Sequence, residues 1–456
     1  MWTMNLAVCS QTPLVRFLSE ELKSMDFVDV ETLVENRDYI FSPGGVTRMV
    51  YPLLLHMRTW RMVEDVWWVS LNPTAPLKFT LNGIKFYSVR VDNASLKGYG
   101  SVKEQMWRLF HGAVDESTPS LLELAWFEDY ASFNLYNRVC AETLSELDKE
   151  EDFDLFYIHD FQQLPTGLML NTLKPKVFRW HIPFNEKIIP PDWSPFLAKF
   201  FNAYEAVIVS CKSYLESLVK RGYRGRTYHI YPYIDFKEYR RPSKAEVDAF
   251  SEKYNIRDDD IVVLLVARLD PLKGHDIAIR ALARAVKRCP NLKMVFVGDG
   301  SFSSSAGGLG LNKAAAWQEK LTRLAESLGL KDRVVFTGYL PRGELDAAYE
   351  RCDLFILPSR AEGFGLVVAE AWLYGKPVIV SSEAGIAEIV EDGKTGYVVN
   401  PHNYEEIAEA LIRLAQNEKL RAEMGEAGRR AVEVLSIERG LKEEAEVLKD
   451  VVEGAS

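Results

Sequence analysis

The sequence predicts an α/β fold with two doubly wound parallel sheets. Short runs of almost uninterrupted apolar residues alternate with amphipathic helical patterns along the chain, which is typical of parallel α/β sheets. Strands this apolar are buried on both faces, as in a sheet covered by helices on each side. The 456 residues also exceed what one hydrophobic core fills, about 250 to 300 residues, so two domains are expected. The clearest predicted strands lie within residues 153–160, 206–214, 261–270, 292–300, 334–340, 353–359 and 376–382.

Residues 231–246 interrupt this pattern. The stretch YPYIDFKEYRRPSKAE has two prolines and a charge cluster, and a new helix and strand follow it. We therefore expect an N-terminal domain at 1–238, a C-terminal domain at 239–435 and a hinge in the linker. The last helix, at 436–456, has a narrow apolar stripe that can pack on either domain, including back on the N-terminal one.

Composition excludes several classes of protein. The formal net charge of −10 argues against a nucleic-acid partner. The five scattered cysteines form no metal-ligand spacing and suit buried positions in a reducing compartment. The N-terminus lacks a signal-peptide pattern, and no apolar run is long enough to span a membrane. We expect a cytoplasmic protein; a homo-oligomer stays open, since composition does not address it.

Two glutamates eight residues apart mark the strongest motif, EGFGLVVAEAW at 362–372. With a helix starting near Leu366, Glu370 lies about one turn inside the helix and Glu362 on the loop before it. Gly363 and Gly365 let the backbone approach a ligand, and the helix N-terminus favours an anion. A plain helix start with solvated glutamates explains the motif about equally well.

A second motif, ARLDPLKGHDIAIRAL at 267–282, carries two cations just after the apolar strand predicted within 261–270. Ligands bind at the carboxyl ends of such strands, so Arg268 and Lys273 are expected to point into a crevice. There they could neutralise a diphosphate, Arg268 as a fork and Lys273 as a point charge. Surface charge is the weaker explanation.

The N-terminal half offers less specific signals. Gly44 and Gly45 precede an apolar helix and could approach a phosphate or sugar, although a structural turn explains them equally well. His159 with Asp160, and Arg179 with His181, end two successive strands and are expected on one rim of the sheet. The segment SFSSSAGGLGLNK at 301–313 reads as a mobile surface insertion rather than a lid.

Taken together, these motifs resemble a known enzyme group. ARLDPLKG, VGDG, FTGYL, EGFGLVVAEA and GKPVIVSSEAGIAEIVEDGKTGYVV occur in the order seen in retaining GT-B glycosyltransferases of the glycogen-synthase and sucrose-synthase-like group. In the N-terminal half, MWRLFHG, WFEDYASFN, YIHDFQQLP and WHIPF resemble trehalose-6-phosphate synthases and trehalose synthases. The resemblance implies two Rossmann-like domains facing a central cleft.

The resemblance also implies roles for individual residues. On the donor side, Arg268 and Lys273 would hold the diphosphate, Glu370 the ribose and Glu362 the sugar hydroxyls. The backbone around Phe364, Gly365 and Leu366 would assist, with Gly45 and its neighbour Gly44 on the opposite wall. His159 would lie beside the reactive end of the donor sugar. The residues expected on the acceptor side are Tyr99, His181 and one of the acidic pair Glu128 and Asp129.

The predicted reaction is hexose transfer with retained configuration, with glucose as the expected hexose. The donor is UDP-, ADP- or GDP-glucose as co-substrate, without a bound cofactor, and the favoured product is trehalose or trehalose-6-phosphate. The arginine that binds phosphate after the first strand in the synthases has no counterpart in AVCSQTPLVR. Transfer to glycerate, glycerol phosphate or a glucan therefore stays open, as does a non-catalytic sugar-binding scaffold.

The expected mechanism needs no metal ion. No carboxylate pair ends a strand beside the predicted donor site, and the two cations already offset the charge on the leaving diphosphate. No residue stands out as a nucleophile, so same-face attack is favoured. An epimerase or a phosphorylase would share the fold; a phosphorylase would need a pyridoxal-phosphate lysine, for which the sequence gives no sign.

Overall fold

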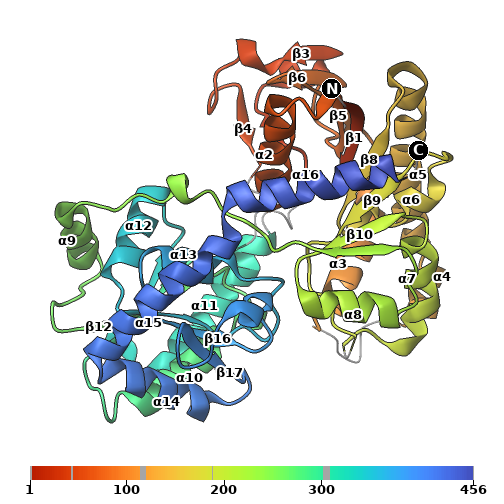
Figure 1. Ribbon diagram of the computed structural model, residues 1–456. Helices are drawn as coiled ribbons and strands as arrows, with labels where there is room; N and C mark the ends of the chain where they lie inside the picture. Colours follow the sequence, from red (N-terminus) through yellow and green to blue (C-terminus); the bar gives the residue numbers. More distant parts are fainter. Residues whose placement is uncertain (1–2, 43–44, 113–119, 187, 301–308, 455–456) are drawn as a thin grey trace. The chain divides into compact units, whose positions relative to one another are not determined.

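The computed structural model describes residues 3–42, 45–112, 120–186, 188–300 and 309–454 (Figure 1). The chain forms two compact units, one of residues Met1–Pro232 with Glu438–Ser456 and the other of Tyr233–Ile437. Each unit is built around its own largely parallel sheet.

Nine strands form the sheet of the first unit, in the order β11-β10-β9-β8-β1-β5-β7-β6-β3. All neighbouring pairs run parallel except β6 and β7, which are antiparallel. The two short strands β2 and β4 pair separately. The strands are β1 (Met4–Ser10), β2 (Val15–Phe17), β3 (Phe27–Asp29), β4 (Tyr39–Phe41), β5 (Val63–Leu71), β6 (Lys78–Leu81), β7 (Ile84–Val89), β8 (Leu155–His159), β9 (Lys176–Arg179), β10 (Ala206–Val209) and β11 (Arg226–His229).

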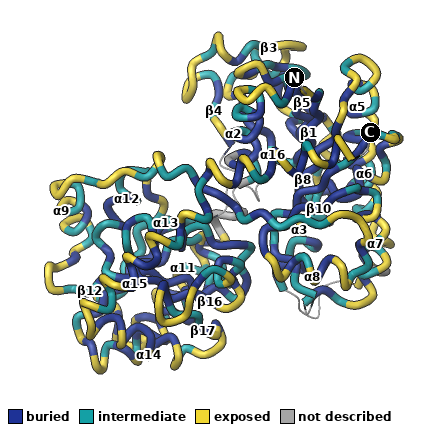
Figure 2. Tube along the Cα trace, in the orientation of Figure 1, coloured by how far each residue is buried: buried dark blue, intermediate teal, exposed yellow. Residues whose placement is uncertain are grey.

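Helices cover this sheet and bury its central strands. The long helix α5 contacts β1, β5 and β7, and α2 contacts β5. The central strands are dark blue in Figure 2, as the near-continuous apolar runs predict. The helices are α1 (Glu20–Ser24), α2 (Gly45–Thr59), α3 (Asn93–Phe110), α4 (Leu121–Trp126), α5 (Glu128–Glu151), α6 (Thr166–Met169), α7 (Ser194–Phe201), α8 (Lys212–Lys220) and α16 (Ile437–Glu453).

The second unit has a six-stranded, all-parallel sheet in the order β14-β13-β12-β15-β16-β17. Its core lies between β12, β13 and the helices α10, α11 and α14. The strands are β12 (Ile261–Val266), β13 (Leu292–Val297), β14 (Val334–Gly338), β15 (Leu354–Leu357), β16 (Val378–Ser381) and β17 (Gly396–Val399). The helices are α9 (Lys244–Lys253), α10 (His275–Ala285), α11 (Leu309–Ser327), α12 (Arg342–Arg351), α13 (Leu366–Leu373), α14 (Tyr404–Ala415) and α15 (Glu418–Ala431).

The strand order places a switch point in each sheet. In the first unit the chain proceeds outward from β1 through β5 and β7, then returns to the other side of β1 with β8. In the second unit it proceeds from β12 through β13 and β14, then returns with β15. Ligands of open α/β sheets bind outside the carboxyl ends of the strands at such points. The segments that follow β8, β12 and β15 are therefore where a site belongs.

The predicted α/β fold with two doubly wound sheets is confirmed, and all seven quoted strands are present. One boundary differs: residues 309–313 were expected in an irregular insertion but are the first residues of α11. Leu309, Leu311 and Lys313 favour a helix, which the neighbouring serines and glycines masked. Residues 301–308 lie outside the described residues.

Candidate active site

An ion pair joins the two loops at the switch point of the second sheet. Lys273 Nζ donates to Glu362 Oε2 at 2.8 Å, and the side chains are only 13% and 19% exposed. Lys273 ends a 3-10 turn after β12, and Glu362 lies on the loop after β15. The two motifs that the sequence singled out independently therefore meet in space.

Arg268 lies on the same loop as Lys273, but its side chain is exposed. Within the part of the chain that the structure describes, no hydrogen bond or ion pair engages its guanidinium, and it keeps all its donors for a ligand. Of the two cations predicted to bind the diphosphate, Arg268 is thus exposed and Lys273 is largely buried.

Two glycines allow these loops to pack closely. Gly274 has φ +73°, and a Cβ there would lie 2.1 Å from the carbonyl oxygen of Pro358, at the end of β15. Gly365 has φ +101° and would meet Leu357 at 2.8 Å. The left-handed backbone favours glycine at both positions, and at Gly274 the Pro358 carbonyl also leaves no room for a side chain.

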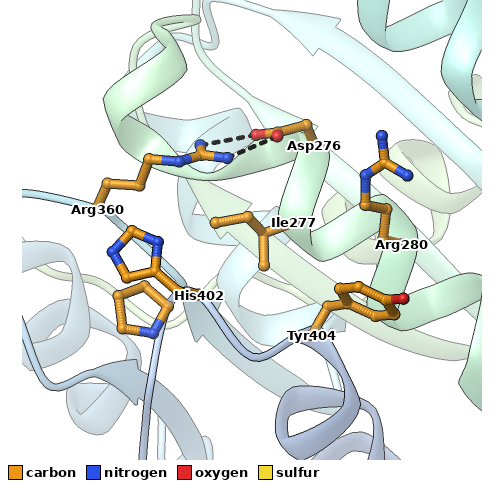
Figure 3. A pocket seen from close by; sticks show the side chains of 7 residues that line it. Asp276, Ile277, Arg280, Arg360, His402 and Tyr404 are labelled. Carbon is orange, nitrogen blue, oxygen red and sulfur yellow. Dashed lines mark hydrogen bonds and ion pairs between the residues drawn. The ribbon is translucent and has the colours of Figure 1, made fainter.

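Arg360 links the two loops, and Figure 3 shows its ion pair with Asp276. Its guanidinium forms a bidentate ion pair with Asp276, at 2.9 and 2.7 Å, and donates to the Pro271 carbonyl at 2.7 Å. Its amide donates to the Leu272 carbonyl, also at 2.7 Å. Arg360 borders a cavity of about 250 Å³ that is also lined by Asp276, Ile277, Arg280, Pro401, His402 and Tyr404.

The backbone around Phe364, Gly365 and Leu366 turns directly into α13. The Phe364 carbonyl accepts from the Ile386 amide at 2.8 Å, and Leu366 is the first residue of the helix, as predicted. Phe364 itself is buried. The loop is therefore held by its own unit and presents the start of α13 beside Glu362.

Glu370 lies one turn into α13, and both its carboxylate oxygens accept hydrogen bonds from tyrosines. Tyr239 donates to Oε1 at 2.9 Å and Tyr349 to Oε2 at 2.7 Å. Burial, followed by the charge of Glu370, raises the pKa of both phenols, so they remain donors. The Arg342 guanidinium lies over the Tyr239 ring, 3.8 Å from its centroid. Glu370 is thus oriented by a fixed pair of donors.

In the first unit, the polar residues at the ends of β8 and β9 meet as expected. His159 pairs in register with Arg179, and His159 Nδ1 lies 3.1 Å from His181 Nε2. Burial, followed by the positive charge of Arg179, holds the pKa of His159 well below its ordinary value. Burial and then the neighbouring His159 and Arg179 do the same to the pKa of His181. Two neutral imidazoles therefore share one hydrogen bond.

Asp160 is buried beside this pair in an unusual backbone conformation. Its φ of 66° and ψ of 163° lie in a region that residues other than glycine seldom adopt. No described residue hydrogen-bonds to Oδ1. Burial raises the pKa of the carboxyl to about 7, although the Phe161 and His181 amides oppose the shift. A strained, buried carboxyl with an unsatisfied oxygen suits a ligand hydroxyl.

Tyr99 on α3 lies close to one member of the acidic pair on α5. Tyr99 is 2% exposed, and its hydroxyl has no partner among the described residues. Burial, followed by the charges of Cys140 and Asp160, raises the pKa of its hydroxyl. Asp129 Oδ1 would lie 3.1 Å from a Cβ on Gly98, next to Tyr99, whereas Glu128 is exposed. The structure therefore brings Asp129, rather than Glu128, alongside the helix of Tyr99.

The remaining predictions concern the two glycines before α2, a metal site, membrane-spanning helices and the cysteines. Gly44 lies outside the described residues, and Gly45 is the first residue of α2. Among the described residues, no group of His, Cys, Asp and Glu is placed to hold a metal ion. Across the described ranges, no helix has the length and apolar character needed to cross a bilayer. All five cysteines are buried, as predicted.

Three residues of this site were missed from the sequence: Arg360, Tyr239 and Tyr349. Arg360 lies two residues before the motif at 362–372, and its spacing from Asp276 carries no local signal. Tyr239 and Tyr349 reach Glu370 from separate elements of the same unit, so only the fold shows that they act on one carboxylate.

Two family models match the chain. Residues 246–431 match the family described as "Glycosyl transferases group 1". Residues 98–216 match the family described as "Trehalose synthase, N-terminal domain". The first match includes Arg268, Lys273 and Glu362; the second includes Tyr99 and His159.

Curated relatives share part of their length with this chain. A GDP-mannose-dependent alpha-(1-6)-phosphatidylinositol monomannoside mannosyltransferase of Mycolicibacterium smegmatis is 34% identical over 208 residues, 44% of this chain and 50% of that protein. A D-inositol 3-phosphate glycosyltransferase of Mycobacteroides abscessus is 34% identical over 185 residues, 41% of this chain and 38% of that protein. The aligned part thus spans half or less of each relative.

The fold extends over nearly the whole chain in solved structures. A UDP-forming alpha,alpha-trehalose-phosphate synthase from Burkholderia xenovorans superposes with a TM-score of 0.71, covering 94% of this chain and 99% of that one at 18% identity. The predicted GT-B fold is confirmed by such neighbours.

Proposed function

We propose that the protein is a glycosyltransferase that uses a nucleotide-sugar donor, because residues 246–431 match the family described as "Glycosyl transferases group 1". The observation that carries the proposal is the Lys273–Glu362 pair at the switch point of the second sheet. A cation beside a carboxylate suits a ligand with phosphates at one position and sugar hydroxyls at the next.

The leaving group determines what these residues do. Breakage of the bond from sugar to diphosphate develops negative charge on the β-phosphate. Lys273 and Arg268 stabilise that charge, and one such donor typically contributes about 100 to 1000-fold in rate. The two cations replace the divalent ion that other transferases use, so the proposed reaction is independent of metal.

The sugar and the nucleoside bind on either side of this point. Glu362 accepts hydrogen bonds from hydroxyls of the donor sugar, and the N-terminus of α13 faces the phosphates. Glu370, oriented by Tyr239 and Tyr349, accepts from the ribose hydroxyls. We also propose that the backbone at Gly44 and Gly45 approaches the diphosphate closely, because glycine has no side chain in the way.

The acceptor side lies at the rim of the first sheet, within the match to the trehalose synthase N-terminal domain. His159 and His181 offer neutral imidazole nitrogens, and Asp160 a carboxyl oxygen, to sugar hydroxyls. Tyr99 and Asp129 extend the same surface. We favour glucose as the transferred hexose and glucose or glucose 6-phosphate as acceptor, which gives trehalose or trehalose-6-phosphate.

Configuration is retained in this proposal by same-face attack. The acceptor hydroxyl attacks the anomeric carbon from the side on which the diphosphate leaves, and the leaving phosphate takes the hydroxyl proton. No nucleophilic side chain is required.

One screen tests donor, acceptor and stereochemistry together. UDP-, ADP- and GDP-glucose and GDP-mannose are each paired with glucose, glucose 6-phosphate, glycerate, glycerol phosphate and inositol phosphate, in EDTA and in Mg²⁺. NMR of the product gives linkage and anomeric configuration. An α-linked disaccharide formed in EDTA supports the proposal. Sugar binding without turnover in every combination would identify a non-catalytic scaffold instead.

A further inference from the structure

Four polar side chains lie on one face of the first sheet below its rim. Tyr157 and His159 are two residues apart on β8, and Arg179 pairs in register with His159 on β9. His181 follows Arg179 by two residues and contacts His159. Because side chains two apart on a strand point to the same face, these residues form one layer.

The C-terminal helix α16 completes this layer with a carboxylate. Tyr157 donates a short hydrogen bond from its hydroxyl to Glu444 Oε1. Glu444 Oε2 lies 3.7 Å from Arg179 Nη1, and the two side chains are 2% and 0% exposed. Arg179 Nη2 donates to the Ile230 carbonyl at 3.0 Å. A helix far along the chain thus holds the arginine that lies beside His159.

Stability alone does not explain the buried Arg179–Glu444 ion pair, because burying two charges has an unfavourable desolvation free energy. Replacing a buried ion pair by apolar side chains of similar volume is often neutral or stabilising, because both charges lose their hydration. Arg179 lies in register beside His159 on the neighbouring strand, and this position gives the pair a different role.

The charge state of the imidazoles decides what they offer to a sugar. Two neutral rings that share one hydrogen bond leave one donor and one acceptor nitrogen, whereas a protonated pair leaves two donors. The charged or titratable groups around them are Tyr157 and Asp160 of β8 and its following loop, Arg179 of β9, and Glu444 of α16. Arg179 is the cation of this set and disfavours proton uptake.

We propose that the Arg179–Glu444 pair is a positioning device that keeps His159 and His181 as a neutral donor–acceptor pair at the sugar site. Glu444 holds Arg179 in place and allows the guanidinium to be buried; Arg179 keeps the rings neutral. The C-terminal helix α16 therefore contributes to the sugar site through Glu444, which positions Arg179. The inference rests on the proposed function only where it assigns a sugar to the imidazoles.

The test removes the charges together and follows the rings directly. Arg179→Met with Glu444→Gln deletes both charges, and the glutamine carbonyl still accepts from Tyr157. The full chain, labelled with ¹⁵N-histidine, is titrated by NMR, and the seven histidines are assigned by single His→Gln replacements. We expect the wild-type pair to stay neutral to the lowest pH at which the protein remains folded, and the double variant to titrate at higher pH.

A matched control separates this effect from loss of stability. Lys293→Met with Asp260→Asn removes another largely buried pair, 3.8 Å apart in the second unit, and should leave the histidine titration unchanged. If the double variant does not fold, Arg179→Met with Glu444→Met and Tyr157→Phe removes both charges and the hydroxyl that donates to Glu444, and carries the same test with the same expected direction. Titration of both rings as in the wild type would overturn the inference.

Activity supplies an independent readout. The acid limb of the kcat/KM profile should move to higher pH in the double variant and stay in place in the control. If the wild type transfers no sugar, the proposed function fails while the NMR titration still decides the role of Arg179 and Glu444.

Discussion

Lys273 and Glu362, 89 residues apart in the sequence, form a 2.8 Å ion pair across the switch point of the second sheet. The pair is largely shielded from solvent, whereas Arg268 on the same loop is exposed. A carboxylate therefore holds one cation in position, and the other remains available. This arrangement leads to separate expectations for the chemistry, the loops and the nucleotide.

Lys273→Ala should lower kcat about 100-fold or more, because the lost ammonium no longer stabilises the leaving diphosphate. The circular dichroism spectrum should be unchanged. Lys394→Ala, which removes an exposed lysine paired with Glu391, is the control and should keep wild-type turnover. Turnover of Lys273→Ala within threefold of wild type would contradict the proposed mechanism.

Gly274→Ala should disrupt the donor loops more than backbone strain alone predicts. The new methyl would lie 2.1 Å from the Pro358 carbonyl oxygen, so the two loops must separate. Gly329→Ala is a matched control, because Gly329 has nearly the same φ, +71°, and no heavy atom within 4 Å of the added Cβ. The control should lose about 1 kcal/mol of stability. Gly274→Ala should lose more, together with donor binding, in thermal unfolding and in KM.

The sequence predicted both sheets because each buried strand is a local apolar run whose pattern needs no partner to be read. It also placed Lys273 and Glu362 correctly at strand ends, since the carboxyl edge of a parallel sheet follows from strand direction. It could not predict contacts made by residues without a motif. Tyr349 reaches Glu370 from α12, and Glu444 reaches Arg179 from the last helix; only the packed fold brings such residues together.

Arg360→Leu should raise the KM for the nucleotide sugar by about tenfold or more and change kcat less. The substitution removes the hydrogen bonds from Arg360 to Asp276 and to the Pro271 carbonyl. The loop that carries Lys273 is then no longer held against the loop that carries Glu362. Arg284→Leu removes another arginine of the same unit, one whose ion pair with Glu405 is half exposed, and should leave KM unchanged. Equal KM values for the two variants would show that the tether does not position the donor.

Glu370→Gln should weaken binding of the nucleoside diphosphate by roughly tenfold, because a charged acceptor of hydrogen bonds becomes a neutral one. Tyr349→Phe should have a smaller effect in the same direction, since it frees Glu370 Oε2 from a bond at 2.7 Å. Calorimetry with the diphosphate measures both. Glu409→Gln, on the exposed face of α14, serves as control. Unchanged affinity in Glu370→Gln would move the ribose site elsewhere.

Asp160→Asn should stabilise the protein at alkaline pH while damaging acceptor use. The folded-state pKa of about 7 is above the unfolded value of roughly 3.9, so between these values the folded protein holds a proton that the unfolded chain lacks. Wild-type stability from this group therefore falls as pH rises from about 4 to about 7, by up to roughly 4 kcal/mol. Asparagine cannot ionise, so the variant should unfold at higher temperature than wild type at pH 8 and at a similar temperature at pH 4. Acceptor KM should rise at pH 8, where the wild-type carboxylate is ionised and accepts a hydroxyl. A stability difference that is the same at both pH values would mean that Asp160 does not titrate in this range.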